Sequence, residues 1–196
     1  TSGKLADQKS KLQRGGMAGT TILTSLVLTA CGGTVATKQS EFTLVDGVYT
    51  GTSGADTLAQ SADTAGLFVN GFAGIDTITT GSGADLVRAG TGADNVSTGD
   101  GDDTIVVVGT TTASEYDSSD IDSSLDKVLT LATLNGQSTS EAASGESINA
   151  GDGTDTLHLY GTLDMSSVTL TGIETIAMHS DVIFSDQQLT ASVAIT

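Results

Sequence analysis

The feature that most constrains this chain is a nine-residue repeat that runs without a gap over residues 71–106. Each copy has glycine at the fourth place, aspartate at the sixth and an aliphatic residue at the eighth. The four consecutive copies are GFAGIDTIT (71–79), TGSGADLVR (80–88), AGTGADNVS (89–97) and TGDGDDTIV (98–106). Two further copies are GTSGADTLA (51–59) and AGDGTDTLH (150–158). A fixed short period is typical of a solenoid, in which stacked repeats bury a continuous core.

The glycine-rich half of each repeat predicts a turn, and the other half predicts a short strand. Glycine adopts positive φ at no steric cost, so several turn carbonyls can face one point. The eighth-place residue is the middle of the strand and points inward. Nine residues then make half of a coil, and residues eighteen apart in the chain stack on each other. The spacing predicts Asp76 stacked on Asp94, and Asp85 stacked on Asp103.

The repeats resemble the G-G-x-G-x-D-x-U-x motif of the RTX family of secreted proteins, where U is aliphatic. The resemblance implies an all-β, right-handed parallel β-roll with Ca²⁺ held between stacked turns by aspartate carboxylates and turn carbonyls. Ca²⁺ takes about six to eight oxygen ligands and tolerates flexible geometry, whereas Mg²⁺ requires a stricter octahedron. The metal-binding residues that the resemblance implies are Asp56, Asp76, Asp85, Asp94, Asp103 and Asp155, with Gly54, Gly74, Gly81, Gly83, Gly90, Gly92, Gly99, Gly101, Gly151 and Gly153.

The chain departs from the family motif in glycine content and in one spacing. The first place holds Thr or Ala in the copies at 80–106 and 150–158, and the second place holds Thr52 and Phe72 in two copies. Asp56 and Asp76 are twenty residues apart, so residues 60–70 form an eleven-residue half-coil with Val69 pointing inward. Asp63 is the alternative ligand in that half-coil.

The spacing of the aspartates also predicts how many ions the roll holds. We expect two ions in the row of Asp56, Asp76 and Asp94, and one more between Asp85 and Asp103. Asp155 either caps or extends the stack. The total is about three to five ions.

The charge of the chain supports a cationic partner. The sequence holds 24 acidic and 7 basic residues, a net charge of −17. After Cys31 there are 3 basic and 23 acidic residues, which gives 3 − 23 = −20. Such a surface excludes nucleic acid, because phosphate binding needs clustered Lys and Arg. Aromatic residues make up 4% of the chain, so the core must be narrow and aliphatic. We expect the chain to be largely disordered without Ca²⁺.

The pattern divides the chain into five segments. An apolar stretch at 17–30 has the length of a signal-peptide core rather than of a membrane-spanning helix. It ends in LTACG, which resembles a lipoprotein signal with Cys31 as the lipidated residue; the alternative is an apolar strand or helix with a buried cysteine. The segments are the signal-like 1–30, a linker or cap at 31–50, the roll at 51–106, an insertion at 107–149 and a continuation of the roll at 150–196.

The insertion and the last third of the chain lack the regular repeat. Apolar residues at helical spacing predict one short helix over 120–132, with Ser119 as its cap, covering an edge of the roll. The acidic residues at its start either bind an ion or, as we favour, form a solvated helix N-terminus; they are Asp117, Asp120, Asp122 and Asp126. Alternating apolar residues after Asp155 predict further strands without regular calcium turns. The G-I-E-T-I run there is similar to segments of bacterial surface-layer proteins and adhesins.

No enzymatic motif accompanies the repeats. The sequence contains neither HExxH nor GxSxG, and His158 and His179 each lack a ligand-spaced partner. The sequence therefore predicts no enzyme but a calcium-binding structural or adhesive protein of the bacterial cell surface or extracellular matrix. The alternative is a folding and secretion module of a larger exported enzyme or toxin. An ice-binding roll is a weaker alternative, because the third-place residues do not form a threonine row. We expect homo-oligomers, filaments or a lattice through the open ends, and membrane contact only through a lipid on Cys31.

Overall fold

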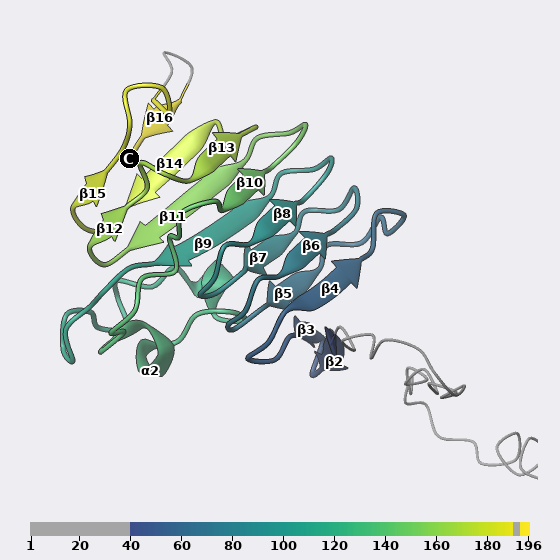
Figure 1. The fold of residues 1–196 in the computed structure, drawn as a ribbon, viewed down its shortest axis with the longest axis horizontal. Coiled ribbons are helices and arrows are strands. Elements are labelled where there is room, and N and C mark those ends of the chain that lie inside the picture. Colours follow the sequence, from purple (N-terminus) through teal and green to yellow (C-terminus); the bar gives the residue numbers. More distant parts are fainter. Residues whose placement is uncertain (1–39, 190–192) are drawn as a thin grey trace, which may run out of the picture. The chain divides into compact units, whose positions relative to one another are not determined.

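The computed structural model describes residues 40–189 and 193–196, and this part of the chain is a parallel β-solenoid (Figure 1). A six-stranded sheet contains, in spatial order, β1 (Ser40–Glu41), β4 (Asp56–Ala59), β6 (Thr77–Thr79), β8 (Asn95–Ser97), β10 (Ser147–Asn149) and β13 (Thr169–Thr171). An eight-stranded sheet contains β16 (Ala194–Ile195), β14 (Thr175–Met178), β11 (Thr156–Tyr160), β9 (Thr104–Val108), β7 (Leu86–Arg88), β5 (Phe68–Asn70), β3 (Val48–Thr50) and β2 (Thr43–Val45). From β4 to β11 successive strands alternate between the two sheets, which confirms the predicted parallel β-roll.

Two further strands and the N-terminal segment complete the description. The strands β12 (Leu163–Asp164) and β15 (Val182–Ile183) form a separate parallel pair, and β2 and β3 form an antiparallel hairpin. The apolar stretch at 17–30 and Cys31 lie outside the described residues. Within the described residues, no helix is long and apolar enough to cross a membrane.

The strand register follows the spacing of the repeats. Ile78 pairs with Val96 across β6 and β8, and Val87 pairs with Ile105 across β7 and β9. Both pairs join residues eighteen apart, as predicted. Leu58 pairs with Ile78 across β4 and β6, twenty residues apart. The two extra residues lie in the half-coil at 60–70, whose Val69 is fully buried as expected.

The core of the roll is a file of aliphatic side chains between the two sheets. Burying each such side chain stabilises the fold by about 1.5–3 kcal/mol. The file consists mainly of the eighth-place residues and their equivalents: Leu58, Val69, Ile78, Val87, Val96, Ile105, Ile148, Leu157 and Ile176. Among the described residues, Phe42 is the one aromatic residue buried in this cluster, and the interior is otherwise aliphatic.

The insertion carries a half-coil of its own and two short helical turns. Its strand β10 pairs with β8 on one side and β13 on the other, so the six-stranded sheet continues through it. The insertion contains one short helix, as expected, but the predicted bounds of 120–132 are wrong: a 3₁₀ turn covers Ser123–Leu125 and α2 covers only Leu131–Leu134. The side chain of Asp122 caps the first turn, and Thr130 forms a reciprocal capping box with Thr133 that begins a new helix.

The insertion covers a face of the eight-stranded sheet, not an edge as the sequence suggested. The outward face of this sheet is apolar where β7, β9 and β11 lie side by side, because Leu86, Val106, Val108 and Tyr160 point away from the interior. An apolar face must be covered by another layer. The covering residues are Tyr116, Leu125, Val128, Leu129 and Leu134, all from the insertion.

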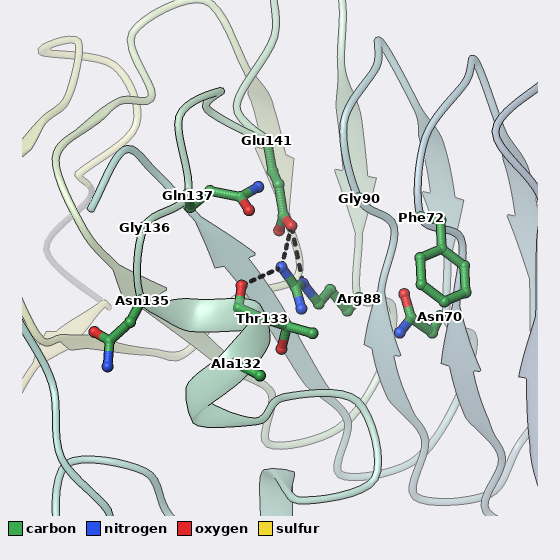
Figure 2. A pocket seen from close by; sticks show the side chains of 10 residues that line it. All are labelled: Asn70, Phe72, Arg88, Gly90, Ala132, Thr133, Asn135, Gly136, Gln137 and Glu141. Atoms are coloured by element: carbon green, nitrogen blue, oxygen red, sulfur yellow. Dashed lines mark hydrogen bonds and ion pairs between the residues drawn. The ribbon is translucent and has the colours of Figure 1, made fainter. Parts of the chain in front are cut away.

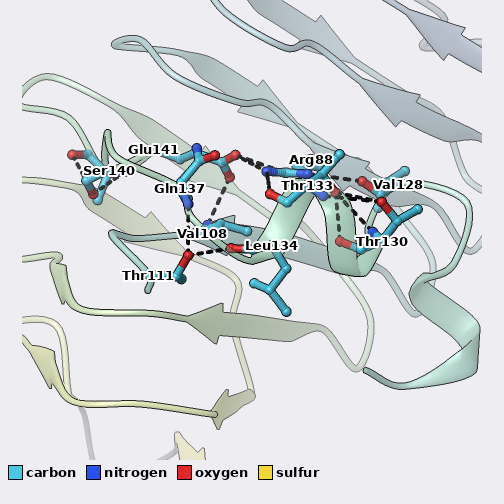
Figure 3. Close-up of polar contacts among 11 residues, drawn as sticks. Arg88, Val108, Thr111, Val128, Thr130, Thr133, Leu134, Gln137, Ser140 and Glu141 are labelled. Atoms are coloured by element: carbon cyan, nitrogen blue, oxygen red, sulfur yellow. Dashed lines mark hydrogen bonds and ion pairs between the residues drawn. The ribbon is translucent and has the colours of Figure 1, made fainter. Parts of the chain in front are cut away.

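A buried ion pair fixes the insertion to the roll. Arg88, at the end of β7, extends toward Glu141 of the insertion (Figure 2). Its Nε and Nη2 donate to Glu141 Oε1 at 2.9 and 2.6 Å, and the Val108 amide donates to the other carboxylate oxygen at 2.9 Å (Figure 3). The side chains are 7% and 3% exposed. A buried pair stabilises a structure only when its remaining donors and acceptors are satisfied, as these largely are.

The close stacking of the turns predicts which glycines are irreplaceable. At Gly92 φ is +147°, and an added Cβ would lie 1.5 Å from the carbonyl oxygen of Gly74 in the preceding coil. We expect Gly92→Ala to lower the free energy of unfolding by about 2 kcal/mol or more, measured by urea denaturation with Ca²⁺ present. The matched control is Gly54→Ala, at the same repeat place, where the nearest atom to the new Cβ would be 3.9 Å away. Equal losses for the two variants would show that the turns do not stack as described.

Candidate metal centre

The sixth-place aspartates form two rows, one before the strands of each sheet. One row is Asp56, Asp76 and Asp94, and the other is Asp85, Asp103 and Asp155. All six carboxylates are buried. The structure therefore brings together all the aspartates that the repeat pattern singled out.

In five of the six carboxylates, one oxygen links its coil to the coil before it, whereas Asp56 Oδ2 accepts hydrogen bonds from Thr52 in its own turn. Asp76 Oδ1 accepts a hydrogen bond from the Asp56 amide at 2.8 Å, and Asp94 Oδ1 accepts one from the Asp76 amide at 2.8 Å. In the other row, Asp103 Oδ1 accepts from the Asp85 amide at 2.8 Å. The same contact recurs from Leu67 to Asp85 and from Asp103 to Asp155. Each of these five aspartates thus fixes the start of the preceding strand on its side of the roll.

The other oxygen of each carboxylate has no hydrogen-bond partner and is buried. These atoms are Asp56 Oδ1 and the Oδ2 atoms of Asp76, Asp85, Asp94, Asp103 and Asp155. Buried polar atoms in folded proteins almost always have a partner, and an unpaired buried carboxylate oxygen is costly. Six such atoms at the same repeat place indicate a partner that is not a protein group.

Burial raises the pKa of these carboxyl groups. It raises the pKa of Asp76 to about 7 and the pKa values of Asp94 and Asp103 to about 6. The value for Asp76 includes the effect of the negative charges of Asp94 and Asp56, which also raise its pKa. Burial also raises the pKa values of Asp85 and Asp155. The rows therefore need a positive charge, which either protons or a metal ion can supply.

The donor atoms around these oxygens suit a hard divalent cation. Within the described part of the chain, no three His, Cys, Asp or Glu side chains gather into one site. A metal here must bind carboxylate oxygens together with turn carbonyls, which are the ligands that Ca²⁺ prefers. Glycine leaves room for it: a Cβ at Gly71 would lie 2.7 Å from the unpaired Asp76 Oδ2. The residues present thus fit Ca²⁺.

Asp155 extends its row, whereas Asp63 lies outside both rows. β11 pairs with β9 with Thr156 opposite Thr104, so Asp155 stacks on Asp103 although 52 residues separate them. Leu67 occupies the sixth place of the odd half-coil, because its amide donates to Asp85 Oδ1. Asp63 accepts a hydrogen bond from the nearby Ala65 amide instead.

Two glutamates that the sequence reasoning missed continue the rows. Glu174 Oε2 accepts a hydrogen bond from the Asp155 amide at 2.9 Å, the same contact that the five aspartates from Asp76 to Asp155 make. Glu146 immediately precedes β10 as Asp94 precedes β8 and is also buried. Burial and the negative charge of Asp94 raise its pKa to about 8. The signal was present as an acidic residue two places before an isoleucine in GESIN (145–149) and GIETI (172–176).

The first-place threonines have a structural role in place of glycine. Thr80 donates its hydroxyl to the Thr98 carbonyl at 2.8 Å, and Thr98 donates to the Ala150 carbonyl at 2.8 Å. Both threonines are buried. Their departure from the family motif therefore adds hydrogen bonds between coils in the row of Asp85 and Asp103.

The acidic residues of the insertion serve local turns. Asp117 Oδ1 accepts from the Ser119 amide at 2.7 Å, Asp120 Oδ2 accepts from the Asp117 amide at 2.7 Å, and Asp122 caps the 3₁₀ turn. The solvated helix N-terminus that we favoured over an ion site is not formed, because these exposed side chains lie in short turns.

The two histidines lie together, whereas the sequence reasoning treated them as isolated. His158 Nδ1 and His179 Nε2 are 3.3 Å apart, and the His179 ring stacks on Tyr160 at 4.0 Å between centroids. Adjacent strands β11 and β14 bring them together, a pairing that their sequence spacing does not reveal.

The raised pKa values predict that acid stabilises the chain when metal is removed. The folded carboxyls titrate at about 6 to 8, above the ordinary values of 3.8 for Asp and 4.5 for Glu. Without metal, the folded state therefore binds more protons than the unfolded state, and its stability falls as pH rises through this window. Far-UV circular dichroism of chelator-treated protein should show more β-structure at pH 5 than at pH 8. More structure at pH 8 would contradict the burial of these groups.

Comparison with known proteins identifies the repeats. The family model of the RTX calcium-binding nonapeptide repeat matches residues 70–105, in four copies. These residues hold two aspartates of each row, Asp76 and Asp94 in one and Asp85 and Asp103 in the other. No curated protein and no solved structure matches the chain. Residues 70–105 therefore match the RTX calcium-binding repeat, and the chain carries a calcium-binding β-roll.

Proposed function

We propose that the protein is a calcium-rigidified structural or adhesive module of the bacterial cell surface or extracellular matrix, which folds when Ca²⁺ binds. The observation that carries the proposal is the set of six buried carboxylate oxygens without partners, arranged in two rows. The family match supplies the identity of the ion. A protein whose ligands come from stacked coils is stiffened along the whole stack when the ions bind.

The proposed ligands are the rows of carboxylates and the turns that precede them. In one row, ions lie between the coils of Asp56, Asp76 and Asp94, and Glu146 closes the row. In the other, they lie between the coils of Asp85, Asp103 and Asp155, and Glu174 closes the row. The turn glycines that contribute carbonyls are Gly54, Gly74, Gly81, Gly83, Gly90, Gly92, Gly99, Gly101, Gly151 and Gly153.

Coupled folding follows from the charge. The net charge of −17 opposes collapse of the chain, and stacking the coils brings carboxylates of equal sign together. A cation that binds only the stacked turns adds its binding free energy to folding. The aliphatic core then stabilises the fold only after a cation has neutralised the aspartate carboxylates of the turns.

An architectural role fits the surface of the roll better than catalysis does. The sequence contains neither HExxH nor GxSxG, and we propose that the protein is not an enzyme. Each described sheet ends in strands with a free edge, such as β13 and β16, and Ile195 on β16 is exposed. Such edges can pair with another copy of the chain, which supports homo-oligomers, filaments or a lattice.

A lipid on Cys31 would hold the module at the outer surface of the cell. The alternative is a folding module of a larger exported protein, and a longer reading frame around this sequence would favour it.

Calcium removal tests the coupled folding. We expect the far-UV circular dichroism of the chain to change from largely disordered to β-rich between chelator-treated and millimolar Ca²⁺ samples at neutral pH. The physical reason is that burying the unpaired carboxylates is unfavourable without a cation. A matched titration with Mg²⁺ should give much less structure, since Mg²⁺ dehydrates reluctantly. A full β-sheet spectrum in excess chelator would refute the coupling.

One aspartate pair tests the register of the rows. We expect Asp94→Ala to weaken Ca²⁺ binding at least tenfold, because Asp94 stacks between Asp76 and Glu146. Asp63→Ala should change affinity less than twofold, since Leu67 and not Asp63 occupies the sixth place. Isothermal titration with Ca²⁺ measures both variants. Similar affinities for the two would mean that the rows are assigned wrongly.

The location at the surface has its own test. Bacteria that express the full reading frame should yield a mature protein that begins at Cys31, carries a lipid by intact mass, and is degraded by protease added to whole cells. Cys31→Ser should release it from the membrane fraction while leaving Ca²⁺ binding unchanged. A mature protein without lipid that still stays on the cell would remove the anchor from the proposal.

A further inference from the structure

A cavity of about 210 Å³ opens between the insertion and the outer side of the roll (Figure 2). Its walls include Asn70, Phe72 and Arg88 from the roll, and Thr133, Gln137 and Glu141 from the insertion. The volume corresponds to about seven water molecules. A single six-membered ring with its substituents is of this size, whereas drug-sized ligands occupy larger pockets.

Phe72, at the rim of this cavity, occupies the second repeat place, where four of the other five copies have glycine. The second place holds Gly90, Gly99 and Gly151 in later coils, at φ of +99°, +100° and +92°. Phe72 adopts φ of +69°, a conformation that a bulky side chain rarely takes. Phe72 is 51% exposed and lies outside both core clusters. A strained residue that adds nothing to the core indicates a function at its side chain.

The polar groups of the cavity favour a neutral ligand. The charges of Arg88 and Glu141 cancel, and both oxygens of Glu141 are occupied by Arg88 and the Val108 amide. Glu141 therefore offers no free charge to a cation. The net charge of −17 disfavours an anion.

Three planar polar groups remain available for hydrogen bonds. Within the described residues, the side-chain amides of Asn70 and Gln137 make no hydrogen bond, so both offer donors and an acceptor. The guanidinium of Arg88 uses Nη1 for one contact, with the Val128 carbonyl at 3.3 Å, which leaves one Nη1 hydrogen. Together with an exposed aromatic ring, these groups match a ring that has hydroxyls around its edge and an apolar C–H face.

We propose that this cavity binds one unit of a neutral saccharide. The apolar face of the sugar ring packs on Phe72, and its hydroxyls bond to the amides of Asn70 and Gln137 and to Arg88. The proposal rests on the proposed function in one respect. Phe72 and Gly90 lie in the turns that lead to Asp76 and Asp94, so this wall of the cavity forms only when those turns are ordered by Ca²⁺. Saccharide binding is therefore calcium-dependent.

Saturation-transfer NMR on the calcium-loaded full chain tests this proposal. The probes are D-glucose, D-galactose, D-mannose and N-acetyl-D-glucosamine, each at millimolar concentration. We expect transfer to the C–H protons of at least one of them, and its loss when chelator is added. D-glucuronate at neutral pH should show weaker transfer than the neutral sugars. Absence of transfer to all four neutral sugars, or stronger binding of glucuronate, would overturn the proposal.

The decisive variant is Phe72→Gly, because it restores the residue that other repeats have at this place. We expect it to keep or raise the melting temperature with Ca²⁺ and to keep the Ca²⁺ affinity, but to lose at least tenfold in sugar affinity. Ile75→Ser is the matched control: Ile75 lies in the same turn, is 66% exposed and does not line the cavity. It should bind sugar as the parent chain does.

The failure of the saccharide site and the failure of the proposed function give different results. Normal Ca²⁺ binding without sugar binding, or sugar binding that survives Phe72→Gly, would overturn the saccharide site and leave the calcium roll intact. Sugar binding by a chain that fails to bind Ca²⁺ would overturn the calcium dependence and the proposed function together. Gln137→Ala, outside the calcium turns, should weaken sugar binding several-fold with Ca²⁺ affinity unchanged.

Discussion

The contact on which the rest of the structure depends is the hydrogen bond from a backbone amide at the start of one coil to the aspartate of the next. It holds one carboxylate oxygen in place and leaves the other without a protein partner, as at Asp76 and Asp94. The same side chain thus sets the rise of the solenoid and creates its demand for a cation. Folding and ion binding are therefore parts of one process, because neither the row nor the ion site exists in the unstacked chain.

This contact is robust to large changes in the connections between coils. Two extra residues precede β6, and a long insertion separates β9 from β11, yet the amide–carboxylate contact recurs from Asp56 to Asp76 and from Asp103 to Asp155. The insertion can be tolerated because it leaves the roll on its outer side and returns through β10 in register. Arg88 and Glu141 then fix it against the sheet that it covers (Figure 3).

The sequence predicted what is periodic and failed where a contact depends on distant segments. The register, the inward Val69 and the two rows follow from counting residues. The cover of the outer sheet face could not be counted, because it requires knowing that Val108 and Tyr160 lie on adjacent strands. Glu146 and Glu174 were missed because a motif written with aspartate ignores a longer carboxylate at the same place. At Glu174 the longer side chain still accepts the Asp155 amide, whereas the carboxylate of Glu146 accepts the nearby Ala143 amide.

The rows are finite because aliphatic residues occupy the sixth place beyond their ends. Leu67 precedes Asp85 in one row, and Val193 follows Glu174. In the other row, Val168 follows Glu146. These apolar residues pack with the core and carry no charge to be neutralised. A solenoid of this kind can therefore place its ion-dependent coils in the middle and end in coils held by apolar packing. Its ends then remain available for contacts while its centre responds to calcium.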